Sequence, residues 1–360
     1  MKPLTCFLFL VFASVIHCQA QQTVAHRLDS LFSRQFKNNE PGGAVLIVKN
    51  GRIVYKKSFG VEDIQTKKKI SSQSLFNVGS ISKTFVAYGI LKLAKQGKLS
   101  LNDDLAKYFS GFKNKEIAKQ VKLYHLLTHT SGLPDNRKVA EDSVFYLTAK
   151  DAENWAPIMQ NDTLEFQPGE KWNYSNPAFN GLALIIEKVT GKKWQDYISN
   201  LIFRPAGMRR STITDGAHPK TGVTHGYLKT ASGKYIEQDY GEEPTFCAAG
   251  NGGVWSSVDE LWKYEQAIQH HVFLDEKWIK KSREVYPLQN WKEKEKLFMG
   301  LCWFIYGDGE NKFIGHTGSQ GGFISDYVWL PGKKIYYVLL CNIPKPIKEI
   351  RKSVLDILER

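Results

Sequence analysis

The chain has 360 residues, of which 42% are hydrophobic and 12% aromatic, and its formal net charge is +13. This length and composition can bury a sizeable core, which argues against an intrinsically disordered chain, and the length favours two lobes. The 49 basic residues are scattered and form no stripe interleaved with aromatics, so we expect a solvated basic surface and no nucleic-acid partner.

The first twenty residues predict a secretory signal peptide. Lys2 carries their only charge, an apolar stretch covers residues 4–16, and a small-x-Ala sequence follows at residues 18–20. The apolar run is shorter than the roughly 20 residues that span a bilayer. We therefore expect a periplasmic or secreted protein without a membrane span. Lipid attachment at Cys18 is the less favoured alternative, because His17 stands where a very small residue is normal.

The start of the mature chain predicts a helix followed by a hairpin. Residues 23–37 have the pattern of an amphipathic helix. Two apolar segments then flank Asn50-Gly51, a strong two-residue hairpin signal because both positions need positive φ. A helical period follows from about residue 80 to 97, where Gly97 ends it.

Helices dominate the middle of the chain, and strands return near its end. Residues 100–300 alternate helical stretches with loops, and Ser257 with Glu260 resembles a capping box that opens a helix. Later strands are expected at residues 301–306, 312–316, 322–330 and 335–341. The final segment, about 345–360, reads as an amphipathic helix.

This order predicts an α/β (α+β) fold with one antiparallel sheet built from both chain ends, flanked by helices, and an inserted, mainly helical lobe. We expect one domain over residues 21–360, with the sheet lobe at about 21–80 and 300–360 and the helical lobe at about 81–299. A site would lie in the crevice between the lobes, where pockets tend to form.

Three cysteines remain after residue 20: Cys247, Cys302 and Cys341. Their number and wide spacing fit neither a disulfide scaffold nor a zinc pattern. Each lies among apolar neighbours, so we expect buried thiols, although one disulfide bond stays open. We expect no metal and no cofactor.

Ser80 and Lys83 form a Ser-x-x-Lys pattern at the start of the helix predicted over residues 80–97. Three positions apart, the two side chains share a helix face, and the helix N-terminus presents N–H groups to an oxyanion. A serine hydroxyl needs a nearby base to become a nucleophile, and lysine can serve if desolvation lowers its pKa. Alone the pattern is weak, because a capped helix with an exposed lysine looks the same.

Three further segments give this pattern its context. Residues 126–133 read Leu-Leu-Thr-His-Thr-Ser-Gly-Leu, residues 168–176 end in Tyr174-x-Asn176, and His316-Thr317-Gly318-Ser319 lies on a predicted strand. The chain resembles the serine β-lactamase and penicillin-binding protein superfamily, whose signature is Ser-x-x-Lys, a Ser-Asp-Asn-type motif and Lys-Thr-Gly. With Tyr-x-Asn it is most similar to the class C branch of β-lactamases, D-alanyl-D-alanine carboxypeptidases, D-aminopeptidases and esterases, over about residues 35–345.

The resemblance implies a catalytic role for three side chains. Ser80 would be the acylated nucleophile, and Lys83 would help to remove its proton. Tyr174 would be the base or the proton shuttle toward the leaving group. The oxyanion hole would use the backbone N–H groups of Ser80 and Ser319.

The resemblance also implies substrate-binding residues, with one departure. Asn176 would bind the substrate's amide or orient Lys83, and His316, Thr317 and Gly318 would form the strand edge beside the substrate. Family members commonly carry lysine where this chain has His316, and histidine is largely uncharged at neutral pH. We therefore expect weaker binding of anionic β-lactams and free carboxylates, and a shift toward neutral esters, amides or D-amino-acid peptides.

A decoy for metal chemistry is the pair His125 and His129, four residues apart as in a zinc-binding helix. The glutamate of that motif is missing, since Leu126 takes its place, so we interpret the pair as helix packing and a structured loop.

The sequence thus predicts an exported serine hydrolase acting through a Ser80 acyl-enzyme on an ester, an amide or D-amino-acid peptide, or a β-lactam. Its substrate would be a small molecule or a peptidoglycan peptide. The alternative is a catalytically slow penicillin-binding or cell-wall-binding protein that keeps the fold. Substrate class, deacylation rate and oligomeric state stay open.

Overall fold

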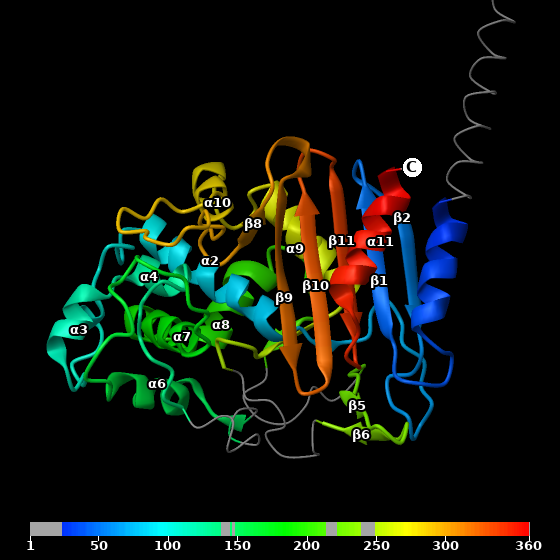
Figure 1. The fold of residues 1–360 in the computed structure, drawn as a ribbon, viewed down its shortest axis with the longest axis horizontal. Coiled ribbons are helices and arrows are strands. Elements are labelled where there is room, and N and C mark those ends of the chain that lie inside the picture. Colours follow the sequence, from blue (N-terminus) through cyan, green and yellow to red (C-terminus); the bar gives the residue numbers. More distant parts are fainter. Residues whose placement is uncertain (1–23, 138–144, 146–147, 214–221, 239–248, 360) are drawn as a thin grey trace, which may run out of the picture.

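The computed structural model describes residues 24–137, 145, 148–213, 222–238 and 249–359. Its centre is a six-stranded sheet with the order β2-β1-β11-β10-β9-β8, in which strands from both chain ends lie side by side (Figure 1). All strand pairs in this sheet are antiparallel. The predicted fold class is therefore confirmed. The predicted signal peptide, with Cys18, lies outside the described residues, and so does Cys247.

The strands of the central sheet follow the predicted pattern closely. They are β1 (Gly43–Lys49), β2 (Arg52–Phe59), β8 (Phe304–Tyr306), β9 (Phe313–Gln320), β10 (Phe323–Leu330) and β11 (Ile335–Cys341). The predicted hairpin is confirmed, since Asn50 and Gly51 join β1 to β2 with φ values of +51° and +73°. The strand expected from residue 301 begins only at 304, because Cys302 has a φ of +77°, which a strand does not adopt.

Each face of the sheet is covered by a different part of the chain. Val45 and Ile47 of β1 pack with the helix at residues 24–35 and with the C-terminal helix α11 (Ile347–Glu359). Ala44 and Leu46 belong to the larger core on the other face, where α9 lies (Figure 1). Successive side chains of a strand point to opposite faces, so β1 is buried on both sides and its sequence is apolar throughout.

Helices and short strands make up the segment between β2 and β8. The helices are α2 (Ser82–Lys95), α3 (Lys115–Gln120), α4 (Leu123–Leu127), α6 (Asp151–Met159), α7 (Pro177–Thr190), α8 (Trp194–Ile198), α9 (Val258–Gln269) and α10 (Glu276–Ser282). The short strands are β3 (Phe76–Asn77), β4 (Thr212–Ile213) and β7 (Val254–Ser256) in one sheet, and β5 (Tyr227–Lys229) with β6 (Tyr235–Glu237) in a hairpin. Within the described ranges, no helix is both long and apolar enough to cross a membrane.

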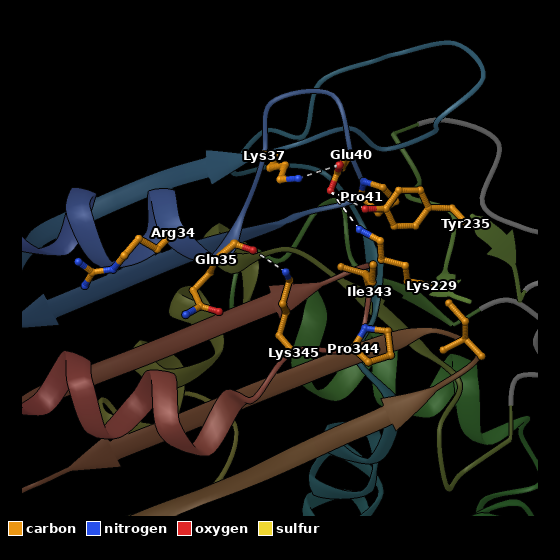
Figure 2. A pocket seen from close by; sticks show the side chains of 11 residues that line it. Arg34, Gln35, Lys37, Glu40, Pro41, Lys229, Tyr235, Ile343, Pro344 and Lys345 are labelled. Carbon is orange, nitrogen blue, oxygen red and sulfur yellow. Dashed lines mark hydrogen bonds and ion pairs between the residues drawn. The ribbon is translucent and has the colours of Figure 1, made fainter. Parts of the chain in front are cut away.

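A basic cavity of about 450 Å³ marks the joint between the chain ends and the β5–β6 hairpin (Figure 2). Lys37 and Lys229 lie 3.4 and 4.0 Å from the Glu40 carboxylate, and Lys345 donates a hydrogen bond to the backbone oxygen of Gln35. Three of its four basic side chains thus already have partners in the protein. None of the predicted site residues lines this cavity, and the contacts of Lys229 and Lys345 join segments that lie far apart in the sequence.

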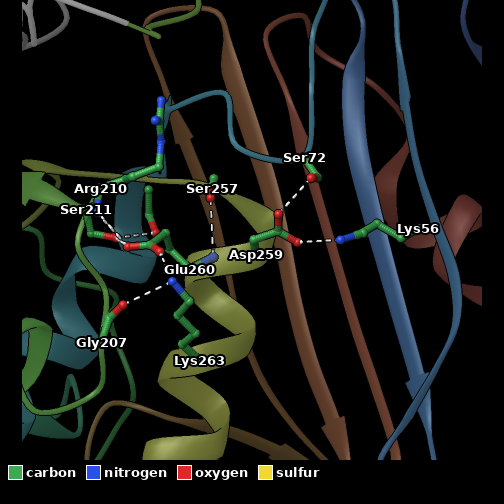
Figure 3. A network of polar contacts seen from close by, with 10 residues as sticks. Lys56, Ser72, Gly207, Arg210, Ser211, Ser257, Asp259, Glu260 and Lys263 are labelled. Carbon is green, nitrogen blue, oxygen red and sulfur yellow. Dashed lines mark hydrogen bonds and ion pairs between the residues drawn. The ribbon is translucent and has the colours of Figure 1, made fainter.

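The predicted capping box at the start of α9 is half confirmed (Figure 3). Ser257 Oγ accepts a hydrogen bond from Glu260 N at 3.3 Å, as an N-cap should. The Glu260 carboxylate instead accepts from the backbone N–H groups of Arg210 (2.9 Å) and Ser211 (3.2 Å), and it pairs with Lys263 at 2.6 Å. Because Glu260 is buried, these contacts bind the chain before β4 to α9.

Candidate active site

Ser80 lies in a single 3₁₀ turn, η1 (Gly79–Ile81), that leads directly into α2. Lys83, one turn further along, is fully buried. Its Nζ donates hydrogen bonds to Ser80 Oγ (2.9 Å) and to the backbone oxygen of Asn251 (2.6 Å). The helical spacing therefore brings the predicted pair into direct contact, and Asn251 adds an acceptor that holds one N–H of the amine.

The surroundings of Lys83 favour its neutral form. Burial lowers the pKa of Lys83 from 10.5 to about 7, and the charge of Arg137 acts in the same direction. An amine with this pKa is unprotonated in a large fraction of molecules at neutral pH. It can then keep one N–H on the Asn251 carbonyl and direct its lone pair at the Ser80 hydroxyl.

Tyr174 lies beside this pair and is held by His129. The centre of its ring is 5.2 Å from Lys83 Nζ, and the His129 ring stacks on it with centroids 4.3 Å apart. His129 also binds both neighbours of Tyr174 in the chain: Asn173 N donates to its backbone oxygen (2.9 Å), and Ser175 N donates to its Nδ1 (3.1 Å). Burial lowers the pKa of His129 well below its usual value. A neutral His129 thus holds residues 173–175 through three contacts: one ring stacking contact and two hydrogen bonds.

Two glycines let the Ser80 turn lie directly against β9. A Cβ atom at Gly79 would stand 2.7 Å from the Ser319 nitrogen, and one at Gly318 would stand 2.0 Å from the Val78 oxygen and 3.0 Å from the Ser80 nitrogen. Gly79 also has a φ of +53°, which side chains disfavour. The backbone nitrogens of Ser80 and Ser319 therefore both lie where the Ser80 turn contacts β9. Two N–H donors can converge there on an oxyanion.

The strand edge beside Ser80 is open over residues 316–319. β8 pairs with β9 only from Phe313 to Gly315, whereas β10 continues along the other side of β9 to Gln320. An extended substrate can add to such an edge through backbone hydrogen bonds.

His316 is buried against Phe304, with ring centroids 4.9 Å apart. Its Nδ1 lies 2.6 Å from the Thr317 oxygen, and since a carbonyl only accepts, Nδ1 carries the proton. Burial and the charge of Lys83 lower the pKa of His316 to about 3. The histidine is therefore uncharged at physiological pH, in agreement with the expectation from sequence.

A cavity of about 380 Å³ opens at this edge and collects the predicted residues. Seven of the eight line it: Ser80, Tyr174, Asn176, His316, Thr317, Gly318 and Ser319. Lys83, the eighth, lies buried behind Ser80 and bonded to it. Phe304, Ile324 and Ile347 complete the lining and give the cavity apolar walls.

Comparison with known proteins agrees with this geometry. The family model described as Beta-lactamase matches residues 20–358. The chain belongs to the β-lactamase family. Members of this family are typically serine hydrolases. The family match confirms the resemblance that the sequence motifs indicated.

Relatives cover most of the chain at modest identity. Penicillin-binding protein 4* of Bacillus subtilis is 28% identical over 84% of this chain and 68% of its own length. Protein flp of Staphylococcus aureus (strain MRSA252) is 34% identical over 53% of this chain, which spans 38% of that protein.

Solved structures of the family show the same architecture. The octameric penicillin-binding protein homologue from Pyrococcus abyssi matches with a TM-score of 0.79 and 27% identity, over 92% of this chain and 77% of that one. The D-amino acid amidase from Ochrobactrum anthropi SV3, complexed with D-phenylalanine, matches with a TM-score of 0.77 and 21% identity, over 95% and 99%. At that identity, the amidase shows a shared fold.

The sequence does not predict two contacts made by the candidate site residues. The interpretation of His129 as part of a structured loop agrees with the structure, but its stacking on Tyr174 has no signal in the sequence. Asn251 contributes a backbone carbonyl, and the Ala-Gly-Asn-Gly-Gly sequence around it indicates only a turn. A side-chain pattern cannot reveal a carbonyl acceptor.

The decoy histidine and the described cysteines have structural roles. His125 Nδ1 accepts a hydrogen bond from Lys122 N at 3.0 Å and so caps the start of α4. This structural role agrees with the interpretation of His125 as a helix residue rather than a metal ligand. Cys302 and Cys341 are buried free thiols whose pKa values burial raises. Across the part of the chain that the structure describes, no group of three or more histidine, cysteine or acidic side chains could hold a metal ion.

Proposed function

We propose that this family member is a serine hydrolase that cleaves neutral amides or esters of D-amino acids through a covalent Ser80 acyl-enzyme. The observation that supports it most strongly is the 2.9 Å hydrogen bond between Ser80 Oγ and Lys83 Nζ, made by a buried lysine whose pKa is about 7. A neutral amine at this distance can take the hydroxyl proton as the oxygen attacks a carbonyl.

The proposed reaction has two halves. Ser80 Oγ bonds to the carbonyl carbon, its proton passes to Lys83 Nζ, and the N–H groups of Ser80 and Ser319 stabilise the oxyanion. The bond to the leaving amine or alcohol then breaks, and Tyr174 gives that group a proton and takes one from Lys83 in return. In the second half, water attacks the acyl carbon and loses a proton to Tyr174 and Lys83. The bond between that carbon and Ser80 Oγ then breaks, Oγ takes the proton from Lys83, and the acid leaves.

The walls of the cavity support a neutral substrate. No lysine or arginine lines it among the residues that the structure describes, and His316 is uncharged. A substrate carboxylate placed there would lose its hydration without gaining a cation, which is costly. The apolar side chains of Phe304, Ile324 and Ile347 suit an apolar D-side chain. The shared fold of an amidase complexed with D-phenylalanine adds support.

Intact-mass spectrometry of the protein tests the acyl-enzyme. We expect a fluorophosphonate to add one label at Ser80, and D-phenylalanine amide and a p-nitrophenyl ester to be hydrolysed. Ser80→Ala should lose both the label and the turnover. Ser82→Ala is the matched serine control and should still be labelled. The Ser82 hydroxyl accepts from Val254 N, and Ser82 does not line the cavity.

Two results would contradict the proposal. Absence of any label on folded wild-type protein, with the fold checked by circular dichroism, would remove the acyl-enzyme. A penicillin adduct that persists while amide and ester stay intact would support the alternative of a slow penicillin-binding protein.

A further inference from the structure

Asp151 is a buried carboxylate that three separate elements bind. Its Oδ1 accepts from Gly250 N and from Asn180 Nδ2, each at 2.8 Å, and its Oδ2 accepts from Trp194 Nε1 at 2.8 Å. Asp151 opens α6, yet these donors lie on α7, on α8 and on the turn before β7. The carboxylate therefore joins three elements, which an ordinary helix-end aspartate does not do.

The turn that Asp151 binds also carries the acceptor for the candidate base. The Asn251 carbonyl accepts from Lys83 Nζ at 2.6 Å. Its side-chain oxygen accepts from Asn180 Nδ2 at 3.3 Å, the same amide that donates to Asp151. Asp151 thus holds the turn twice, directly at Gly250 and indirectly through Asn180.

Close packing transmits this hold to Asn251. A Cβ atom at Gly250 would stand 2.6 Å from the Phe179 oxygen and 2.7 Å from the Ala183 Cβ. The turn is therefore pressed against α7 at the residue that Asp151 binds. A shift of Gly250 would move the next residue, Asn251, and the carbonyl that receives Lys83.

We propose that Asp151 is a positioning residue for Lys83, because it holds the Gly250–Asn251 turn where the Asn251 carbonyl binds one N–H of the amine. The other side of the amine then faces Ser80. The consequence for catalysis rests on the proposed function, whereas the placement of Lys83 can be measured without any turnover.

The charges around Asp151 are consistent with this role. Burial raises the pKa of Asp151 to about 7, against the effect of its three hydrogen bonds, and the Glu187 charge on α7 also raises it. The ionised carboxylate is the stronger acceptor for Gly250 N. Asp151 therefore holds the turn best at the pH values where Lys83 is neutral.

The test compares Asp151→Ala, which removes both acceptor oxygens, with wild type by three measurements. The Lys83 pKa is followed by carbon-13 NMR at Cε, with the signal assigned by its absence in Lys83→Met. Because an ammonium that loses its carbonyl acceptor is less stable, we expect a lower Lys83 pKa. Hydrogen–deuterium exchange of residues 249–254 should rise at least about tenfold. The kcat/KM for a p-nitrophenyl ester should fall about tenfold to a hundredfold.

Trp194→Phe is the matched control. It removes the donor to Oδ2 but leaves Oδ1 bound to Gly250 and Asn180, so Tm should fall while the Lys83 pKa stays at its wild-type value. If Asp151→Ala does not fold, Asn180→Ala replaces it. That variant breaks the indirect hold alone and should shift the Lys83 pKa in the same direction by a smaller amount.

The inference is overturned if Asp151→Ala leaves both the Lys83 pKa and the exchange of residues 249–254 unchanged. It is also overturned if Trp194→Phe changes both as much as Asp151→Ala does. A wild-type protein that is not acylated at Ser80 would refute the proposed function instead, and the NMR and exchange measurements would still decide the role of Asp151.

Discussion

Replacing Lys83 by methionine should stabilise the folded protein while it abolishes turnover. The pKa of Lys83 falls from 10.5 to about 7 on folding, and this difference corresponds to about 5 kcal/mol against the protonated form. Methionine has a similar length and no charge, so it removes that cost. The Asn251 carbonyl loses its donor, which costs about 1–3 kcal/mol. We expect a net gain of about 2–4 kcal/mol in unfolding free energy at pH 6.

The pH dependence of this gain provides the sharper test. The unfolded chain keeps the lysine proton up to its pKa of 10.5, whereas the folded protein releases it near pH 7. Between these values the unfolded state binds more protons, so the wild-type unfolding free energy rises with pH by about 1.4 kcal/mol per unit. Lys83→Met lacks this contribution. Because half of the folded molecules still carry the proton at pH 7, its advantage over wild type should shrink by about 2 kcal/mol between pH 7 and pH 9.

Urea denaturation followed by circular dichroism at pH 7, 8 and 9 measures this difference. Lys95→Met is the matched control, because it removes an exposed lysine from the same helix. The reasoning is refuted if the advantage of Lys83→Met does not change with pH, or if Lys95→Met shows the same trend.

Three further substitutions test the rest of the site. Gly79 has a φ of +53°, and a Cβ atom there would stand only 2.7 Å from Ser319 N. Gly79→Ala should therefore lower kcat/KM about a hundredfold and also lower Tm. Equal activity would show that the contact with β9 is dispensable. His129→Phe keeps a ring beside Tyr174 but leaves Ser175 N without its acceptor. The unfolding free energy should therefore fall by about 1–3 kcal/mol, and kcat should fall by a larger factor than KM changes. A change in KM alone would argue against positioning of Tyr174 by His129. His316→Lys should raise the kcat/KM for a D-peptide with a free carboxylate relative to its amide at least about tenfold, and an unchanged ratio would show that this position does not read substrate charge.

Much of the fold could be predicted because its signals are local. The Asn50-Gly51 turn requires positive φ at two adjacent residues, and the apolar runs of β1 and β11 mark strands buried on both faces. The errors arose where tertiary contacts prevailed. Cys302 adopts a positive φ and donates its N–H to the Leu127 oxygen, which delays the start of β8. Glu260 binds backbone N–H groups outside its own helix instead of completing a capping box.

By itself the sequence determined that Ser80 and Lys83 meet, because three residues of helix place both side chains on one face. The resemblance carried by the motifs also predicted that Tyr174 and the strand at residues 316–319 lie beside Ser80, and all of them line one cavity. Only the tertiary structure decided how deeply Lys83 is buried, and that burial sets its pKa. Its acceptor at Asn251 lies 168 residues away and is a backbone carbonyl, and the Asp151 contacts that hold it come from three separate elements. No side-chain pattern along the chain encodes such contacts, because they exist only once distant segments pack together.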